Sequence, residues 1–393
     1  MLIGLCMASF VFLPIVRATT GFSELVYIVP IVILTVLGTL RNLNAVSFTR
    51  ATLAHIILGM TFCSWMLLSS MWTLSTGQVI MDSILIVYFL LILILSASLH
   101  TIRVARWVLF WIIVSAIITS AGVLAGYYLT GNLKGYNTPV HEFYLVASSI
   151  IGAGCVGLAT HLLFTYRPRG VLFVPLLLLF SGLALSLGRM ALIATIALTL
   201  VFGLYASKPR SLWKYSRARI RLSIIQGGAT ALLIGGVLWG AMQVDRTASR
   251  ISRLLGGVDR ELSVGGRGQL WSSAWDAIGH APLLGHGLGS SGVLASGREG
   301  YYPHNLFLQI WVDGGLVGVL LMGLLLAYPL TLLIRSKLRS DPHLLPLVAI
   351  YLFFILTYQT SSSVYTARPL VLLGVLITGW LSTLKGVRRN FNG

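Results

Sequence analysis

Charged residues are scarce in this chain, and acidic ones most of all. Only 10% of the 393 residues are charged, with 10 Asp and Glu against 28 Lys and Arg, and the mean hydropathy is +0.89. Soluble domains carry about 25% charged residues. The composition therefore excludes a soluble globular protein and predicts a chain that lies mostly within a membrane.

Cysteines are also few, and motifs that bind cofactors are scarce. The three cysteines, Cys6, Cys63 and Cys155, fall in apolar segments, and their odd number suggests neither a disulfide framework nor a thiolate metal site. No Gly-Lys-Ser/Thr phosphate loop occurs, and the histidines between 280 and 304 lack the close spacing of zinc ligands. We therefore expect no metal and no other cofactor.

What the sequence has in abundance is apolar runs of about 20 residues, each long enough to cross a hydrocarbon core of about 30 Å. About twelve such spans are predicted, which makes the expected fold class an all-α polytopic membrane protein. The first run lacks the features of a cleaved signal peptide and is expected to be a retained span. The predicted spans are 2–16, 24–41, 52–72, 78–97, 104–126, 142–165, 171–187, 190–206, 220–241, 303–334, 343–361 and 366–384.

One connection is far longer than the others. Residues 242–302 separate the ninth and tenth spans, so that 1–241 holds spans one to nine and 303–393 holds spans ten to twelve of one integrated domain. Long loops in compact proteins are usually functional. Its glycine-rich turns and amphipathic stretches predict short helices lying on the bundle, one of them at Gln269–His280.

The distribution of Lys and Arg predicts the orientation. Most basic residues fall in alternate connections, the densest group at 208–221. Cytoplasmic loops retain positive charge, so both termini are expected in the cytoplasm and the 242–302 loop on the outer side of the membrane. Topology and anionic membrane lipids account for the net charge of +18. Nucleic acid is therefore not expected as a partner.

Within the long loop, Arg246, Arg250, Arg253 and Arg260 share one helical face. Such a basic stripe has two interpretations. It can simply bind lipid headgroups at the interface, or it can guide an anionic lipid-linked substrate.

Three side chains on the expected outer face form the candidate site: Arg189 in the tight turn 186–189, Arg267 between two glycines, and His304. The planar guanidinium binds phosphate oxygens through two parallel hydrogen bonds. The proton affinity of imidazole suits removal of a hydroxyl proton near neutral pH. Arg189 also has a second interpretation, an interfacial arginine that snorkels to the headgroups.

His304 opens the tenth span and likewise has two interpretations. Pro303 and Asn305 around it are typical of a helix N-terminus, with Asn305 as the cap. If the span 303–334 is helical throughout, it is about 48 Å long, so its first turns project outward and place His304 in a polar outer cavity. Asp313 would then lie on the opposite face, so an orienting partner of the imidazole is expected from another segment.

The order of motifs around these residues resembles the O-antigen ligase and polymerase superfamily, and its O-antigen ligases in particular. The motifs are Arg189 in a tight outer turn, Gly-Arg-Gly-Gln-Leu-Trp at 266–271, Pro-Leu-Leu-Gly-His-Gly-Leu-Gly at 282–289, His-Asn-Leu-Phe-Leu-Gln at 304–309 and Asp-Gly-Gly-Leu-Val-Gly at 313–318.

The resemblance implies a GT-C-like membrane glycosyltransferase with its active site facing the periplasm. Its donor would be an O-polysaccharide on undecaprenyl pyrophosphate, and its acceptor a sugar hydroxyl of the lipid A core. Arg189 and Arg267 would hold the pyrophosphate, and His304 would be the base of a metal-independent, inverting displacement. The residues given secondary roles at the site are Gln269, Asn305, Arg246, Arg250 and Arg253.

Other functions share parts of this pattern. An O-antigen polymerase or a protein O-oligosaccharyltransferase would use the same donor. The 127–141 connection is short for a polymerase, and the chain has no added soluble outer domain of the protein-modifying kind. A transporter or flippase for lipid-linked glycans usually has intramembrane charges in two matching halves, which this sequence lacks.

Overall fold

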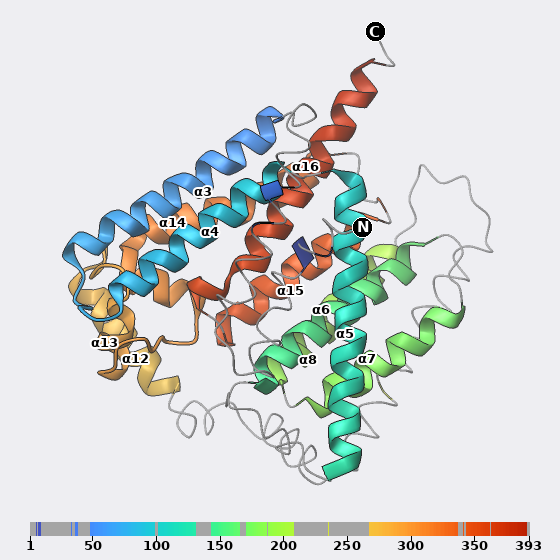
Figure 1. The fold of residues 1–393 in the computed structure, drawn as a ribbon, viewed down its shortest axis with the longest axis horizontal. Coiled ribbons are helices and arrows are strands. Elements are labelled where there is room, and N and C mark those ends of the chain that lie inside the picture. The colour runs from blue at the N-terminus through green and yellow to red at the C-terminus, as the bar shows by residue number, and fades with distance from the viewer. Residues whose placement is uncertain are drawn as a thin grey trace. The chain divides into compact units, whose positions relative to one another are not determined.

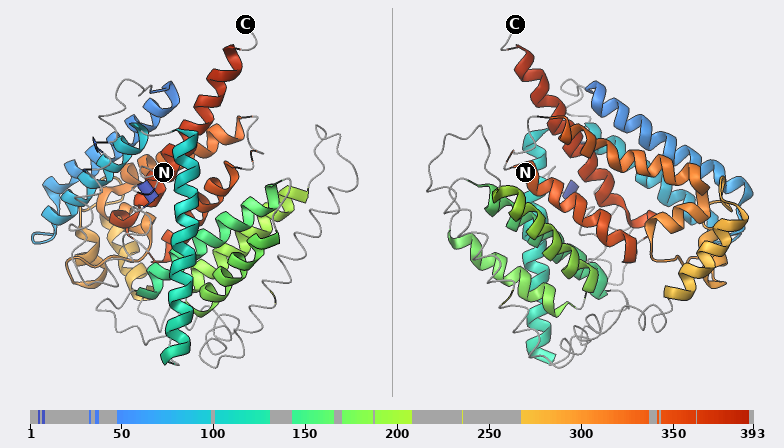
Figure 2. Two further views of the ribbon diagram at one scale, coloured as in Figure 1. Left: turned by 45° about the vertical axis from the view of Figure 1, so that its right-hand side comes forward. Right: turned by 180° about the vertical axis from the view of Figure 1, so that it is seen from behind.

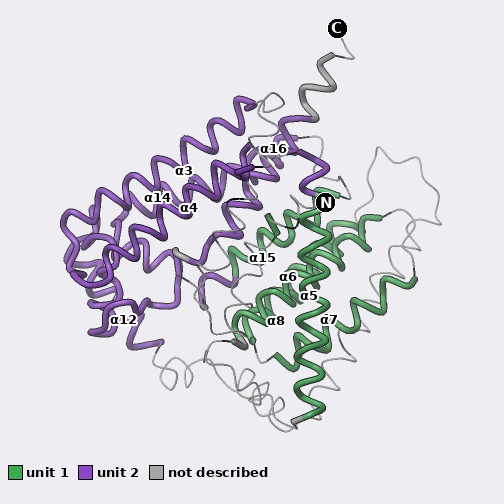
Figure 3. Tube along the Cα trace, viewed as in Figure 1, with its two compact units in different colours: residues 1–33, 106–254, 338–356 green, residues 34–105, 255–337, 357–393 purple. Residues whose placement is uncertain are grey.

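The structure is a computed structural model. It describes residues 48–98, 101–130, 143–165, 170–186, 188–207, 267–336, 341, 343–361 and 363–390, together with a few isolated helical positions outside these ranges. Every regular element in these ranges is a helix (Figure 1). The chain divides into two compact units, coloured separately in Figure 3. Unit 1 comprises Met1–Ile33, Arg106–Leu254 and Leu338–Leu356, and unit 2 comprises Leu34–Ala105, Leu255–Lys337 and Thr357–Gly393.

Unit 1 is built around the buried helix α6. Small residues along α6 allow neighbouring helices to approach closely, as is common in membrane bundles. At Gly154 an added Cβ would overlap Ala116 of α5, and at Gly152 it would overlap the Phe353 ring of α15. The helices of this unit are α5 (Ile102–Thr130, whose first turn belongs to unit 2), α6 (Phe143–Phe164), η3 (Gly170–Leu172), α7 (Phe173–Leu185), α8 (Arg189–Ser207) and most of α15 (Leu345–Ser361).

Unit 2 contains two of the three candidate residues, Arg267 and His304. In it α3 packs against α4, α14 and α16, which lie along one another in Figures 1 and 2. The shorter α12 and α13 pack against each other and against α14. The elements are α3 (Arg50–Ser69), η2 (Ser70–Trp72), α4 (Val79–Ser98), α12 (Arg267–His280), α13 (Ser290–Ser296), α14 (Leu306–Ile334), η4 (Val364–Thr366) and α16 (Arg368–Asn390).

The all-α polytopic prediction is confirmed at the level of class. Six of the described helices are long and apolar enough to cross a membrane, namely those at Arg50–Trp72, Val79–Ser98, Ile102–Leu129, Leu145–Phe164, Arg189–Ala206 and Leu306–Ile334. The apolar parts of α7, α15 and α16 are shorter. The predicted spans 2–16, 24–41 and 220–241 lie outside the described ranges, apart from a few isolated positions. The total of twelve spans, the GT-C-like arrangement and the division at 242–302 therefore stay predictions.

The tenth span differs from the expected uninterrupted helix. At Gly315 the backbone of α14 leaves the helical region, with φ 65° and ψ −167°. The three carbonyl groups of Val312–Gly314, which would otherwise bond within the helix, accept hydrogen bonds from elsewhere. His286 N–H donates to Val312 O over 2.7 Å, Gly287 N–H to Asp313 O over 2.9 Å, and Trp65 Nε1–H to Gly314 O over 2.8 Å.

The N–H groups that follow the break also have hydrogen-bond partners outside the helix. Leu316 N–H donates to Pro282 O over 2.9 Å, and Val317 N–H donates to Leu283 O over 3.4 Å. Irregular backbone within a membrane-spanning helix is tolerated where other parts of the protein supply the missing hydrogen-bond partners. The segment Pro282–Gly289, hereafter the 282–289 loop, supplies most of them. Its glycines let its backbone lie directly against that of α14, since a Cβ at Gly285 would meet the Gly315 backbone.

Gly315→Ala is expected to destabilise the protein. The added Cβ would overlap the backbone of Leu283 and Gly285, and φ is positive, so the substitution strains a position that has no free space. We expect the melting temperature in detergent to fall by several degrees. Gly323→Ala, in the same helix but with nothing within 4 Å of its added Cβ, is the matched control. Equal melting temperatures for the two variants would contradict the steric role given to Gly315.

Candidate active site

Helix α12 places the first candidate residue, Arg267, at its N-terminus. The helix predicted at Gln269–His280 is confirmed and begins two residues earlier. Ala274, Ala277 and Ile278 form its buried face and pack against Leu308 and Val312 of α14. Apolar contact along this face fixes α12 to the first turns of α14.

One tryptophan of α12, Trp275, is not buried. Trp275 is 53% exposed, and its ring meets Trp311 edge-on, with the ring centroids 5.6 Å apart. It lies at the margin of the buried stripe because it falls about 100° from Ala274 around the helix. Trp275 therefore lies at the edge of the face that packs on α14, and its side chain is only partly covered.

The second candidate, His304, precedes α14. Asn305 is the N-cap residue, with its side-chain oxygen accepting from Leu308 N–H over 3.0 Å. The predicted cap is thus confirmed, whereas Pro303 lies before the helix and not in its first turn. His304 has φ 55° and is the one non-glycine residue with positive φ in the described part of the chain. This left-handed backbone is uncommon outside glycine.

Aromatic side chains contact His304 and the residue before it. The Tyr302 ring centroid lies 4.4 Å from that of the imidazole. Trp271 of α12 donates its indole N–H to Pro303 O over 2.8 Å, at the residue immediately before the histidine. The imidazole Nδ1 is buried, and no described residue hydrogen-bonds to it. The nitrogen is therefore available to a partner that the described residues do not supply.

Burial and a neighbouring positive charge keep His304 neutral. Desolvation is the larger cause and the Arg267 guanidinium the second, and together they lower the pKa of His304 to about 4. Both causes disfavour the imidazolium form. The structure thus brings two of the three predicted site residues together, an uncharged imidazole and a guanidinium within electrostatic reach of each other.

The remaining predicted residues divide into two groups. Arg189 begins α8 and is half-buried, but it belongs to unit 1, so its role beside the other two stays a prediction. Gln269 is exposed on α12. Arg246, Arg250 and Arg253, with Arg260, lie outside the described residues.

Asp313 has a structural partner of its own. Its buried carboxylate accepts from Ser291 N–H over 2.7 Å and from Ser291 Oγ over 3.3 Å, at the start of α13. This agrees with the inference from helical spacing that Asp313 does not orient His304. His286 also has a hydrogen-bond partner within the fold, because its Nε2 donates to Ala277 O over 2.8 Å.

Two features of the site were missed by sequence reasoning. The Trp271 bond to Pro303 O had no recognisable signal, because a tryptophan on an apolar helix face is usually core. The 282–289 loop did carry a signal, its alternating glycines, three of which have positive φ. They were interpreted as turns, yet they also mark the close approach of two backbones.

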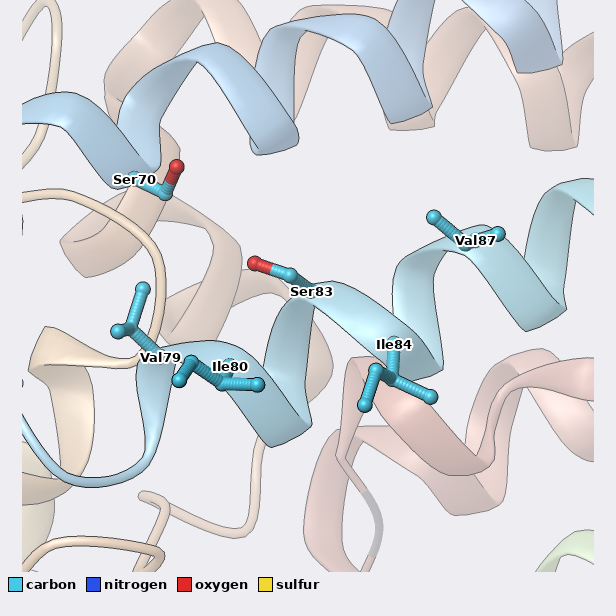
Figure 4. Close-up of a pocket in the computed structure, with 6 residues that line it drawn as sticks. All are labelled: Ser70, Val79, Ile80, Ser83, Ile84 and Val87. Carbon is cyan, nitrogen blue, oxygen red and sulfur yellow. The ribbon is translucent and has the colours of Figure 1, made fainter.

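Within the described ranges, no group of three or more His, Cys, Asp or Glu side chains is placed to hold a metal ion. An open apolar pocket lies elsewhere in unit 2, between the end of α3 and the start of α4 (Figure 4). Its lining includes Ser70, Ser83 and the apolar side chains of Val79, Ile80, Ile84 and Val87. It contains none of the candidate residues.

Together these features define a class of protein: a polytopic α-helical membrane protein with a neutral histidine and an arginine at adjoining helix starts. A family model described as O-Antigen ligase matches residues 174–323, a range that includes Arg189, Arg267 and His304. A protein of Pseudomonas aeruginosa named O-antigen ligase is 26% identical over 324 residues, covering 79% of this chain and 72% of the relative. Both matches support a similarity of this chain to the O-antigen ligase family, and at the level of that family they imply a glycosyltransferase-type enzyme.

Proposed function

We propose that this protein is an O-antigen ligase of the bacterial inner membrane, with both termini cytoplasmic and the site on the periplasmic face. It transfers a polysaccharide from undecaprenyl pyrophosphate to a sugar hydroxyl of the lipid A core. The observation that carries the proposal is the pairing of a neutral His304 with Arg267, within the region that matches the ligase family.

The proposed chemistry is a direct displacement. His304 takes the proton of the acceptor hydroxyl, and the hydroxyl oxygen attacks the anomeric carbon of the donor. The bond from that carbon to the pyrophosphate oxygen breaks, with inversion, and undecaprenyl pyrophosphate leaves. Negative charge grows on the leaving oxygen, so Arg267, with Arg189 as a proposed second ligand, stabilises the transition state more than the bound donor. The N–H groups of the first turn of α12, which have no acceptor within the helix, can add to this anion site.

Donor binding is also expected to make His304 a better base. Arg267 contributes to the low pKa of His304 in the free protein, and a bound pyrophosphate would offset that positive charge. The base must be neutral, so the rate falls as pH drops through its pKa. We expect the acid limb of kcat/KM, which reports free protein, near pH 4, and that of kcat, which reports the donor complex, at higher pH. Coincident limbs would contradict this electrostatic link.

Reconstitution tests the function itself. The purified protein is incorporated in liposomes with undecaprenyl-pyrophosphate-linked O-polysaccharide and rough lipopolysaccharide, in EDTA and without ATP. We expect a ladder of ligated lipopolysaccharide on a gel, which would also establish metal independence. Donor-to-donor elongation in place of the ladder would indicate a polymerase, and movement of intact donor across the bilayer without product would indicate a flippase.

A further inference from the structure

Trp271 links α12 to the backbone that carries His304. Its indole N–H donates to the carbonyl oxygen of Pro303 over 2.8 Å. Arg267 and Trp271 are four residues apart, so they share one face of α12. The ring also packs against the apolar cluster between α12 and α14. One helix face therefore carries both the guanidinium beside the imidazole and the group that binds the peptide before it.

The backbone at His304 needs such support. A histidine with φ 55° lies in a conformation that is uncommon outside glycine and that persists only where neighbours hold it. Trp271 binds the peptide on one side of this residue, and the Asn305 cap holds the helix start on the other. Tyr302 packs against the ring itself.

We propose that Trp271 is a positioning residue, which through the Pro303 carbonyl holds the His304 imidazole at the orientation and depth required beside Arg267. This inference rests on the proposed function of His304 as the base. It adds to that function one specific hydrogen bond. Loss of this bond would leave both His304 and Arg267 in the protein.

Loss of this hydrogen bond is expected to slow the chemical step and to leave donor binding nearly unchanged. Without the bond, the 303–304 peptide can relax out of the left-handed region, and the imidazole moves relative to the acceptor hydroxyl. Misplacement of a reacting group by about 1 Å can cost up to about 100-fold in rate. Donor binding is affected little, because Arg267 and the start of α12 are unchanged.

Trp271→Phe tests the proposal, since it keeps an aromatic ring but removes the N–H donor. Trp275→Phe, on the next turn of the same helix and half-exposed, is the matched control. In the reconstituted assay we expect Trp271→Phe to lower kcat about 10- to 100-fold with donor KM within about twofold of the parent. Trp275→Phe is expected to keep the parental kcat. Melting temperature and membrane insertion are measured for both.

The pH profile separates positioning from a general loss of structure. In the described part of the chain, the groups placed against the imidazole are Arg267 and Tyr302. A loosened imidazole gains water, so its pKa rises toward the ordinary value and the acid limb of kcat/KM moves to higher pH. A purely structural defect would lower the amount of active protein and leave the limb in place.

If the phenylalanine variant fails to insert, 3-benzothienylalanine at position 271 replaces the N–H by sulfur at nearly constant shape. Parental kcat and pH profile in either variant, with His304→Asn inactive, would overturn the positioning role alone. Full activity of His304→Asn would instead overturn the proposed base, so the two failures are distinguishable.

Discussion

Replacing His304 by Asn is expected to abolish nearly all ligation while leaving the protein folded and inserted. General-base assistance is typically worth about 10²–10⁴-fold, and His304 is the one imidazole that the described structure places beside Arg267. Asn is the sharper substitution because it adopts a left-handed backbone more readily than Ala, so the φ of 55° can be kept without the base. Product formation in the reconstituted system measures the loss.

His280→Asn is the control for that experiment. His280 is an exposed histidine at the end of α12 whose Nδ1 bonds to Asp276 O, within the same helix. We expect it to retain the parental rate. If the His304→Asn protein ligates at the parental rate, the assignment of His304 as the base is contradicted, whatever the substitution does to stability.

Arg267→Ala is expected to cause the second largest loss, about 10²–10³-fold in kcat/KM. A preorganised donor aimed at developing negative charge is typically worth this much. Arg267→Lys keeps the charge but loses the planar fork, so we expect an intermediate loss. Removing the charge also removes one of the two causes that lower the pKa of His304, so the acid limb of Arg267→Ala should move to higher pH.

Arg298→Ala is the matched control, an exposed arginine in the same unit. It is expected to leave both the rate and the pH profile unchanged. Equal effects of the two alanine substitutions would indicate that Arg267 contributes only to the general positive charge of the surface. Arg189→Ala in the same assay tests whether the third predicted residue behaves as Arg267 does.

The candidate site shows which expectations from sequence agree with the structure. His304 and Arg267 were selected by chemistry, an imidazole and a guanidinium near predicted helix starts on the outer side, and the structure places them together. The N-cap role of Asn305 followed from local sequence because capping involves residues three apart. The Trp271 bond joins segments far apart in the chain, and no local pattern encodes such a contact.

The tenth span shows the opposite case. Its apolar length predicts an uninterrupted helix, and a glycine pair within such a run is compatible with one. The break at Gly315 is stable only because the 282–289 loop and Trp65 replace the lost helical hydrogen bonds. A helix interruption inside a membrane bundle depends on partners supplied from elsewhere, so it is a tertiary property.

By itself, the sequence determined that this is a membrane protein of apolar helices, because the thickness of the bilayer dictates the length of each apolar run and the lack of water there dictates helix. It also determined the candidate side chains, because their chemistry does not depend on the fold. Only the tertiary structure decided that Arg267 and His304 are neighbours, that His304 is desolvated, and that α14 is interrupted at Gly315. Each of these depends on which distant segments meet, and that is settled by packing and by the partners that buried polar groups find.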